Sequence, residues 1–353
     1  MSLYKALKTS IFRGIPALSD LQNTHGTSTR KIDFAGIREL VREDMHATDM
    51  LIEEQLHSDV VLINKVASYI IHSGGKRFRP LLVLLGSRLF GNKKHHHIAL
   101  AAIVEFIHTA TLLHDDVVDA SDLRRGQETA NTVWGNEASV LVGDFLYSRA
   151  FQMMVKVGNM RIMEIFADTT NVIAEGEVMQ LLNCNDPETT EERYLSVIRA
   201  KTAKLFEAAT QMGSVLHERS TKEQQAMADF GLHLGTAYQL VDDILDYRGD
   251  IDEIGKNVGD DLAEGKPTLP LIYAMRVGSE TQASAIREAI REGQRGETQH
   301  ILQAVESTGA IAYTSAAARA EANLALKALS VIPPSPYREA LGELVEFSVD
   351  RSY

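Results

Sequence analysis

The stretch from Ile107 to Gly126, IHTATLLHDDVVDASDLRRG, sets three aspartates in an apolar helical pattern and follows them with two arginines. Asp115, Asp116 and Asp119 stand at i, i+1 and i+4, so on a helix the first and third lie one turn apart with the second beside them. Like charges at this spacing repel, and more strongly where water is excluded. We therefore expect a cation between them, and carboxylate oxygens without cysteine suit Mg²⁺.

The same spacing recurs far along the chain. The segment Tyr238–Tyr247, YQLVDDILDY, carries Asp242, Asp243 and Asp246. A single acidic triplet on a helix is usually a solvated surface patch. Two triplets in apolar helices favour instead two carboxylate clusters that face each other across one metal site.

Composition favours a helical protein with one large core. Eight prolines and abundant Ala, Leu, Glu and Met are typical of helices. We expect an all-α domain over residues 34–353 and an N-terminal extension over residues 1–33. This extension is rich in Lys and Arg, so it is either a flexible or helical arm of a cytoplasmic protein or a mitochondrial transit peptide.

Charge and cysteine usage restrict the partners. The net charge of −12 argues against nucleic acid, and an anionic substrate would need local basic clusters or bound metal. Cys184 is the only cysteine, which excludes an internal disulfide and fits a reducing compartment. We expect no transmembrane segment, because the longest apolar stretch, Ile98–Leu113, is shorter than the roughly 20 residues of a membrane span and is interrupted by Glu105 and His108.

Several further segments carry basic residues that could meet an anion. They are Lys76 and Arg79 after the Gly74-Gly75 turn, Lys201 on a core-facing helix, and Lys256 and Lys266 in the polar stretch from Arg248 to Pro270. Each has an ordinary alternative: a basic helix end, a lysine stem that crosses apolar surface, or a flexible surface loop.

The run His95 to His97 falls in an expected turn between helices. A histidine tract can bind metal. Because no carboxylate partner is evident nearby, we expect a solvated loop and assign it no role.

Five segments, in this order, resemble the motifs of the trans-isoprenyl diphosphate synthases. They are GGKRFRP at 74–80, HDDVVDASDLRRG at 114–126, KTAKLF at 201–206, YQLVDDILDY at 238–247 and GDDLAEGKPTLPL at 259–271. The resemblance covers most of the chain from about residue 40. It implies a single-domain all-α isoprenoid-synthase helical bundle around a deep central cavity, usually as a homodimer.

The resemblance also implies a role for each singled-out residue. Three Mg²⁺ ions would bind an allylic diphosphate through Asp115, Asp119 and Asp242, supported by Asp116, Asp243 and Asp246. Four basic residues would complete that allylic site: Arg124, Lys201, Lys256 and Lys266. Four others would bind isopentenyl diphosphate: Lys76, Arg79, His108 and Arg125. Thr202 and Gln239 would place oxygen lone pairs near the allylic cation as it develops.

The positions before the first triplet predict a long product. Short-chain relatives carry bulky aromatics four and five residues before the first aspartate. This chain has Thr111 and Ala110 at those positions, and Ile107, one turn further back, also carries no ring. We expect an octaprenyl to decaprenyl chain for quinone side chains, with peripheral membrane contact for product release as an accompanying hypothesis. The alternative is a shorter geranylgeranyl or farnesyl product.

Two rival functions are a class I terpene cyclase and a non-catalytic subunit of a heteromeric synthase. A cyclase binds one diphosphate, so it would not need both GGKRFRP and the Arg124-Arg125 pair. A non-catalytic subunit typically lacks some of the carboxylates, whereas both triplets are intact here.

Overall fold

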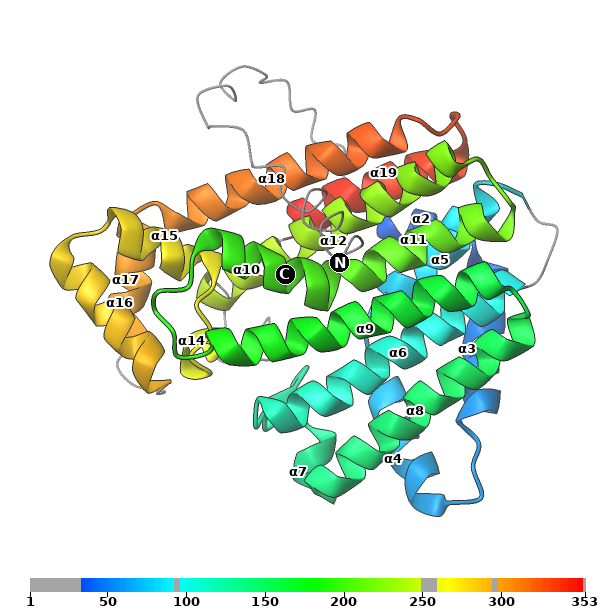
Figure 1. Ribbon diagram of the computed structural model, residues 1–353, viewed down its shortest axis with the longest axis horizontal. Helices are drawn as coiled ribbons and strands as arrows, with labels where there is room; N and C mark the ends of the chain where they lie inside the picture. Colours follow the sequence, from blue (N-terminus) through cyan, green and yellow to red (C-terminus); the bar gives the residue numbers. More distant parts are fainter. Residues whose placement is uncertain (1–32, 92–95, 249–258, 294–297, 352–353) are drawn as a thin grey trace, which may run out of the picture. The chain divides into compact units, whose positions relative to one another are not determined.

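Helices make up nearly all regular structure in the computed structural model, which describes residues 33–91, 96–248, 259–293 and 298–351 (Figure 1). The predicted all-α class is confirmed. In chain order the helices are α2 (Phe34–Glu39), α3 (Arg42–Leu56), α4 (Val61–His72), α5 (Phe78–Arg88), α6 (His96–Val118), α7 (Ala130–Trp134), α8 (Asn136–Val157), α9 (Met160–Asn183), α10 (Glu191–Ile198), α11 (Lys204–Leu216), α12 (Thr221–Arg248), α14 (Asp260–Ala263), α15 (Leu269–Val277), α16 (Glu280–Glu292), α17 (Thr298–Ser307), α18 (Ala310–Leu329) and α19 (Pro336–Val349). A π-helical turn, η2 (Arg199–Ala203), joins α10 to α11.

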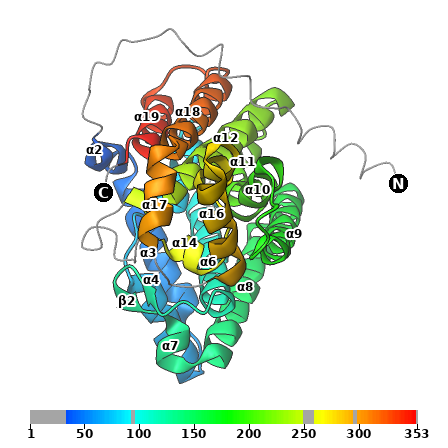
Figure 2. The ribbon, with the colours of Figure 1, turned by 90° about the vertical axis from the view of Figure 1, so that its left-hand side faces the viewer.

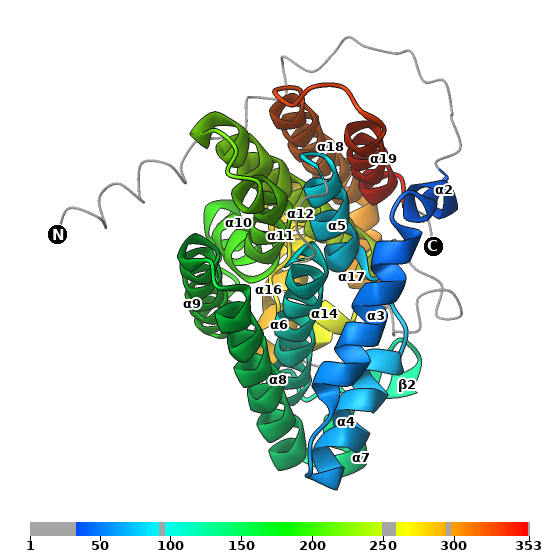
Figure 3. The ribbon, with the colours of Figure 1, turned by 90° about the vertical axis from the view of Figure 1, so that its right-hand side faces the viewer.

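The helix α6, which carries the first aspartate triplet, lies in the interior of the bundle. It packs against α3, α5, α8 and α11, and these helices surround it in Figure 3. Its residues from Leu100 to Ile107 are all buried. Among the described helices, only α6 is long and apolar enough to cross a membrane. However, 67% of its apolar 18-residue stretch is buried inside the fold. Its apolar character is therefore explained by its place in the core.

The second triplet lies on α12, which packs between α11 and α18. The C-terminal helices α15, α16 and α17 form a separate apolar cluster at one end of the bundle (Figure 2), built on Leu271, Ile286, Ile290 and Val305. Leu262 of this cluster anchors residues 259–268, which contribute to the candidate site.

A two-stranded antiparallel hairpin follows α6. Its strands are β1 (Leu123–Arg124) and β2 (Gln127–Glu128), and Leu123 pairs with Glu128. Arg125 and Gly126 form the tight turn with φ values of 54° and 74°. The hairpin turns the chain back and brings Arg124 beside the end of α6.

The solvated loop expected at His95–His97 is wrong for its last two residues. His95 lies outside the described residues, α6 begins at His96, and His97 is 3% exposed. Its Nε2 lies 3.3 Å from Asp44 Oδ1 on α3, and Arg88 of α5 donates to both oxygens of Asp44 at 2.5 and 2.6 Å. Burial alone would raise the pKa of Asp44, but the Arg88 hydrogen bonds and His97 outweigh it and hold that pKa below its usual range. The cluster ties α3, α5 and α6 together.

The predicted N-terminal extension lies outside the described residues except for Asp33. That side chain accepts a hydrogen bond from Gly36 N at 2.9 Å and caps α2. Asp33 therefore belongs to the helical unit.

Candidate functional site

The first triplet lies at the C-terminal end of α6, with Asp119 in the turn just after Val118, and each carboxylate meets a basic side chain. Asp116 is fully buried, and the side chains of Asp115 and Asp119 are 16% exposed. The pairs are Lys201 Nζ to Asp115 Oδ2 at 3.4 Å, Lys266 Nζ to Asp119 Oδ2 at 2.9 Å, and Arg124 Nη2 to Asp116 Oδ1 at 2.6 Å. Positive charge thus lies against the carboxylates, and three of the basic residues named from the sequence supply it.

Lys201 and Thr202 are presented by the π turn η2. Two glycines let neighbouring helices approach it: a Cβ on Gly176 of α9 would lie 2.8 Å from Lys201 N, and one on Gly235 of α12 would lie 2.6 Å from Ala203 Cα. No larger residue fits at either position without a shift of backbone. Single π turns inside helices occur frequently at functional sites, where the extra residue redirects side chains. No pattern in the sequence predicted this turn.

Glu177 is a site residue that the sequence analysis missed. Its Oε2 accepts from Lys201 Nζ at 2.7 Å, so Lys201 lies between Glu177 and Asp115. Burial, and then the Asp115 charge, raise the pKa of Glu177 to about 7 against the pull of Lys201. Burial likewise raises the pKa of Asp115. The two carboxylates together carry more negative charge than the one lysine offsets.

Each carboxylate of the second triplet, on α12, has a different partner. Asp242 Oδ1 pairs with Arg351 Nη1 at 2.9 Å, and Asp246 Oδ2 accepts from Asp261 N at 3.3 Å. Asp243 is 2% exposed and accepts from neutral donors. The polar contacts also bring Thr202 and Gln239 together, as the resemblance implied.

Two connections join the triplets. Lys266 contacts Asp119 on α6, while Asp261 of the same polar segment contacts Asp246 on α12. Thr202 Oγ1, next to the lysine that contacts Asp115, donates to Gln239 Oε1 of α12 at 2.9 Å. The remaining predicted allylic-site residue, Lys256, lies outside the described residues.

The donor set fits a hard divalent cation that brings further oxygen ligands with it. Among the described residues, no three His, Cys, Asp or Glu side chains close on one point as a complete metal cage. Two buried oxygens, Asp116 Oδ2 and Glu177 Oε1, have no hydrogen-bond partner. Carboxylate oxygens with an incomplete protein shell suit Mg²⁺, which keeps waters and substrate phosphate oxygens as ligands.

A second basic cluster is built by the loop before α5 and by the hairpin. The loop needs positive φ at Gly74 (89°), Gly75 (135°) and Arg77 (49°). A Cβ on Gly75 would lie 2.8 Å from Arg125 Nη1, which donates to Gly74 O. Glycine here thus serves both the backbone conformation and the close approach of the arginine.

Arg79 and His108 lie at the centre of this cluster. Arg79 Nη1 is 3.1 Å from His108 Nε2, and the guanidinium stacks over the Phe206 ring at 4.7 Å. Arg79 Nε is buried without a hydrogen-bond partner. Burial, and then the Arg79 and Arg125 charges, hold the pKa of His108 well below its usual range, so the ring is neutral. An unpaired buried donor beside further guanidinium groups is suited to an anion.

Arg351, near the C-terminus, was also missed. Its side chain is 3% exposed, stacks over the Tyr238 ring at 3.7 Å and pairs with Asp242. Lys76 Nζ lies over the Phe347 ring at 4.9 Å, and burial together with the Arg351 charge lowers the pKa of Lys76. Arg351 thus stands between the α12 carboxylates and the predicted isopentenyl diphosphate site.

The predicted chain-length residues lie in the bundle interior. Ala110 and Ile107 are fully buried, and the half-buried Thr111 donates its hydroxyl to His108 O at 2.7 Å. None of the three carries a ring, so the structure places small or flexible side chains along α6 behind the carboxylates.

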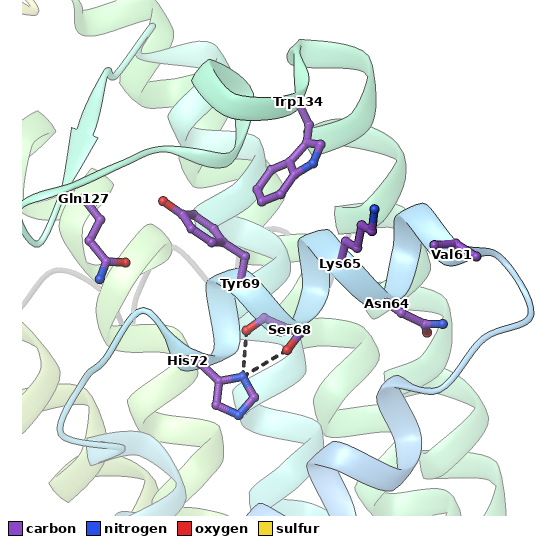
Figure 4. Close-up of a pocket in the computed structure, with 8 residues that line it drawn as sticks. All are labelled: Val61, Asn64, Lys65, Ser68, Tyr69, His72, Gln127 and Trp134. Carbon is purple, nitrogen blue, oxygen red and sulfur yellow. Dashed lines mark hydrogen bonds between the residues drawn. The ribbon is translucent and has the colours of Figure 1, made fainter.

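A separate surface pocket lies between α4, α7 and the hairpin, and none of the predicted site residues lines it (Figure 4). Tyr69 and Trp134 meet edge to face with ring centres 5.0 Å apart, and the Tyr69 hydroxyl donates to Glu128 O at 2.8 Å. On α4, His72 Nδ1 lies 2.8 Å from Ser68 O. The Tyr69 hydroxyl thus joins the hairpin that carries Arg124 to α4, and the ring contact joins α4 to α7.

Comparisons with known proteins agree with this geometry. The model of the polyprenyl synthetase family matches residues 60–308. The octaprenyl diphosphate synthase of Escherichia coli is 52% identical over 89% of this chain and 98% of its own length. The all-trans-nonaprenyl-diphosphate synthase (geranyl-diphosphate specific) of Rhodobacter capsulatus is 45% identical over 88% and 96%. A crystal structure of a polyprenyl synthase from Caulobacter crescentus, complexed with calcium and isoprenyl diphosphate, superposes with a TM-score of 0.88 at 44% identity and covers 91% of this chain and 99% of its own.

Proposed function

Since this chain belongs to the polyprenyl synthetase family, we propose that it is a prenyltransferase that joins isopentenyl diphosphate units head to tail onto an allylic diphosphate. The product is a long all-trans polyprenyl diphosphate. One observation carries the proposal: two basic clusters flank the same acidic helix, one at the carboxylates of α6 and one around His108. Two anion sites beside one metal-type carboxylate cluster suit two diphosphate substrates.

Divalent metal use follows from the donor set and from the calcium-bound relative. We further propose that the site binds three Mg²⁺ ions. Asp115, Asp119 and Asp242 would hold these ions, with support from Asp116, Asp243 and Asp246. When bound, the ions supply positive charge that draws the negative charge of the allylic diphosphate away as its C–O bond breaks.

The basic side chains divide between the two diphosphates. Lys201 and Lys266, which contact carboxylates of α6, complete the allylic site together with Arg124 and Lys256. Arg79 and Arg125 bind isopentenyl diphosphate, where the guanidinium fork matches phosphate oxygens, and Lys76 and His108 complete that site.

No side chain acts as a nucleophile in this mechanism. The alkene of isopentenyl diphosphate attacks the allylic cation, and the departing diphosphate accepts the final proton. Thr202 and Gln239 present oxygen atoms to the developing charge, and the apolar interior behind α6 excludes the water that would otherwise capture it.

The long product is favoured by the long-chain relatives and by Ala110, whose position holds no ring. Supply of quinone side chains is the proposed use of this product. The short-chain alternative and the non-catalytic subunit are not favoured, because both aspartate triplets are intact and the octaprenyl and nonaprenyl synthases are 52% and 45% identical to this chain. Contact with a membrane at product release stays a prediction.

We place the enzyme in the cytoplasm, and the bacterial relatives give no support to mitochondrial targeting. A homodimer is the proposed assembly. The outer surfaces of α8 and α9 support it, because they expose large apolar side chains: Leu141 at 66%, Val155 at 67%, Met160 at 78% and Leu182 at 70%. Exposed apolar side chains on two neighbouring helices suit a subunit interface.

The proposal is tested by inorganic diphosphate release with Mg²⁺ and each substrate alone or both together. We expect release only when both substrates are present, because the alkene drives turnover. Release from the allylic diphosphate alone, with a hydrocarbon product, would instead identify a cyclase. No release with any primer would contradict the prenyltransferase.

A further inference from the structure

Tyr194 is a buried tyrosine of α10 that belongs to none of the motifs. It is 5% exposed, and its hydroxyl donates a hydrogen bond to Asp243 Oδ2 on α12. Burial and the nearby Asp243 charge raise the pKa of this hydroxyl well above its usual range, so it keeps its proton. The ring packs α10 against α12, but the hydroxyl also begins a chain of hydrogen bonds that ends in the candidate site.

Asp243 is the second member of that chain. Its other oxygen, Oδ1, accepts from Gln239 Nε2 at 2.8 Å, and Gln239 stands one turn earlier on the same helix. The carboxylate is 2% exposed. Both of its oxygens are therefore held by neutral donors inside the protein, in contrast to Asp242, which pairs with the cationic Arg351.

Gln239 carries the chain on to Thr202. An amide has its nitrogen and oxygen on opposite sides, so when Nε2 bonds Asp243 the oxygen is directed elsewhere. That oxygen accepts from Thr202 Oγ1 at 2.9 Å. A hydroxyl has one hydrogen, and Thr202 uses it on Gln239. Toward any other group the Thr202 oxygen can therefore offer only lone pairs.

We propose that Tyr194 is a positioning residue for prenyl transfer: through Asp243 and Gln239 it holds the Thr202 hydroxyl with its lone pairs, rather than its hydrogen, available to the allylic carbon. This inference rests on the proposed function. Lone pairs held in place before the reaction stabilise the positive charge that develops in the transition state, whereas a hydroxyl hydrogen would oppose it. The hydrogen bonds set this direction, because Asp243 Oδ1 takes the amide nitrogen of Gln239 and so leaves the amide oxygen to Thr202.

Tyr194→Phe removes the hydroxyl and leaves the ring. We expect kcat to fall about tenfold, since the lost bond to a carboxylate is worth at least that factor when it orders the transition state. The KM of each diphosphate should stay within about twofold, because Tyr194 contacts neither basic cluster. Tyr313→Phe is the matched control: it removes a half-buried hydroxyl of α18 that donates to the carboxylate of Glu191 on α10 at 3.0 Å and lies outside the five motifs. Its kcat should equal that of the parent.

Asp243→Asn provides a second, independent variant. Tyr194 keeps donating to the remaining carbonyl oxygen, which leaves the new amide nitrogen to donate to Gln239 Oε1. Gln239 then turns over and offers its nitrogen to Thr202, whose hydrogen points outward. We expect a larger fall in kcat than for Tyr194→Phe. The Mg²⁺ concentration for half-maximal rate should stay unchanged, because both oxygens of Asp243 are taken by Tyr194 and Gln239 and its support of the metal ions is only indirect. A raised Mg²⁺ requirement would instead assign Asp243 to the metal ions and overturn the positioning role. The double variant Tyr194→Phe with Asp243→Asn should be no slower than Asp243→Asn alone, since both substitutions act through the same series of hydrogen bonds.

The outcomes separate the inference from the function on which it rests. If the parent turns over and Tyr194→Phe keeps its kcat within twofold, or if Tyr313→Phe loses as much, the positioning role is wrong and the prenyltransferase stands. If the parent itself releases no diphosphate from both substrates, both fail. Should Tyr194→Phe unfold at the assay temperature, the kcat and Mg²⁺ dependence of Asp243→Asn decide the question.

Discussion

Replacing Ala110 by phenylalanine tests where the growing product lies. Ala110 is fully buried and stands five residues before Asp115, about 7.5 Å along α6 at 1.5 Å per residue. Ile103, also buried and on the same side of α6, lies about 18 Å from Asp115 by the same measure. A ring at Ala110 would therefore stop the growing prenyl chain less than halfway from Asp115 to Ile103. We expect the first condensations to continue and the product to shorten to a few isoprene units.

The assay is elongation with labelled isopentenyl diphosphate, followed by chromatography of the dephosphorylated products. The control is Ala101→Phe, because Ala101 is equally buried but lies nine residues from Ala110, on the opposite side of α6. A ring there should only overpack the core, at about 1–3 kcal/mol, and lower the melting temperature without shortening the product. If Ala110→Phe made the same long product as the parent, or if both variants shortened it equally, the tail would not run along this side of α6.

Three further predictions concern single side chains. Asp115→Ala should lower turnover by at least about a hundredfold, since the metal ions contribute several kcal/mol of transition-state stabilisation. Its melting temperature should stay equal or rise, because a buried charge is removed. Turnover within tenfold of the parent would contradict the metal site. Arg79→Ala should raise the KM of isopentenyl diphosphate far more than that of the primer, and the reverse in steady-state kinetics would mean that the two sites are exchanged. Asp44→Ala should cost about 3 kcal/mol in denaturant unfolding at neutral pH, because Arg88 loses its buried partner. Since the pKa of Asp44 is held low in the fold, this contribution is complete above the unfolded pKa of about 3.9 and is lost as the pH falls below it, so the variant and the parent should converge in acid.

The sequence predicted those parts of the site that depend on spacing within one helix or one turn. Asp115 and Asp119 share a face because they stand at i and i+4, and the structure brings Lys201 and Lys266 to them. The composition and the apolar periodicity were sufficient for the all-α class. The resemblance named Thr202 and Gln239 as neighbours of the allylic cation, and their hydrogen bond to each other is seen only in the structure.

What the sequence did not reveal depends on contacts between segments far apart in the chain. Glu177, Tyr194 and Arg351 each gain their role from a partner on another helix, and nothing in their local sequence distinguishes them from ordinary surface or core residues. His97 was expected in a loop because Asp44, its carboxylate partner, lies on another helix. The π turn at Arg199–Ala203 follows from close packing against two glycines, which carry no pattern of their own.

The most direct test of the central claim is the mass of the product made by the purified protein. With Mg²⁺, an allylic primer and excess isopentenyl diphosphate, mass spectrometry should detect a linear polyprenyl diphosphate in the octaprenyl to decaprenyl range. The absence of any chain longer than the primer would contradict prenyl transfer. A product that stops at farnesyl or geranylgeranyl diphosphate would contradict the long channel behind Asp115.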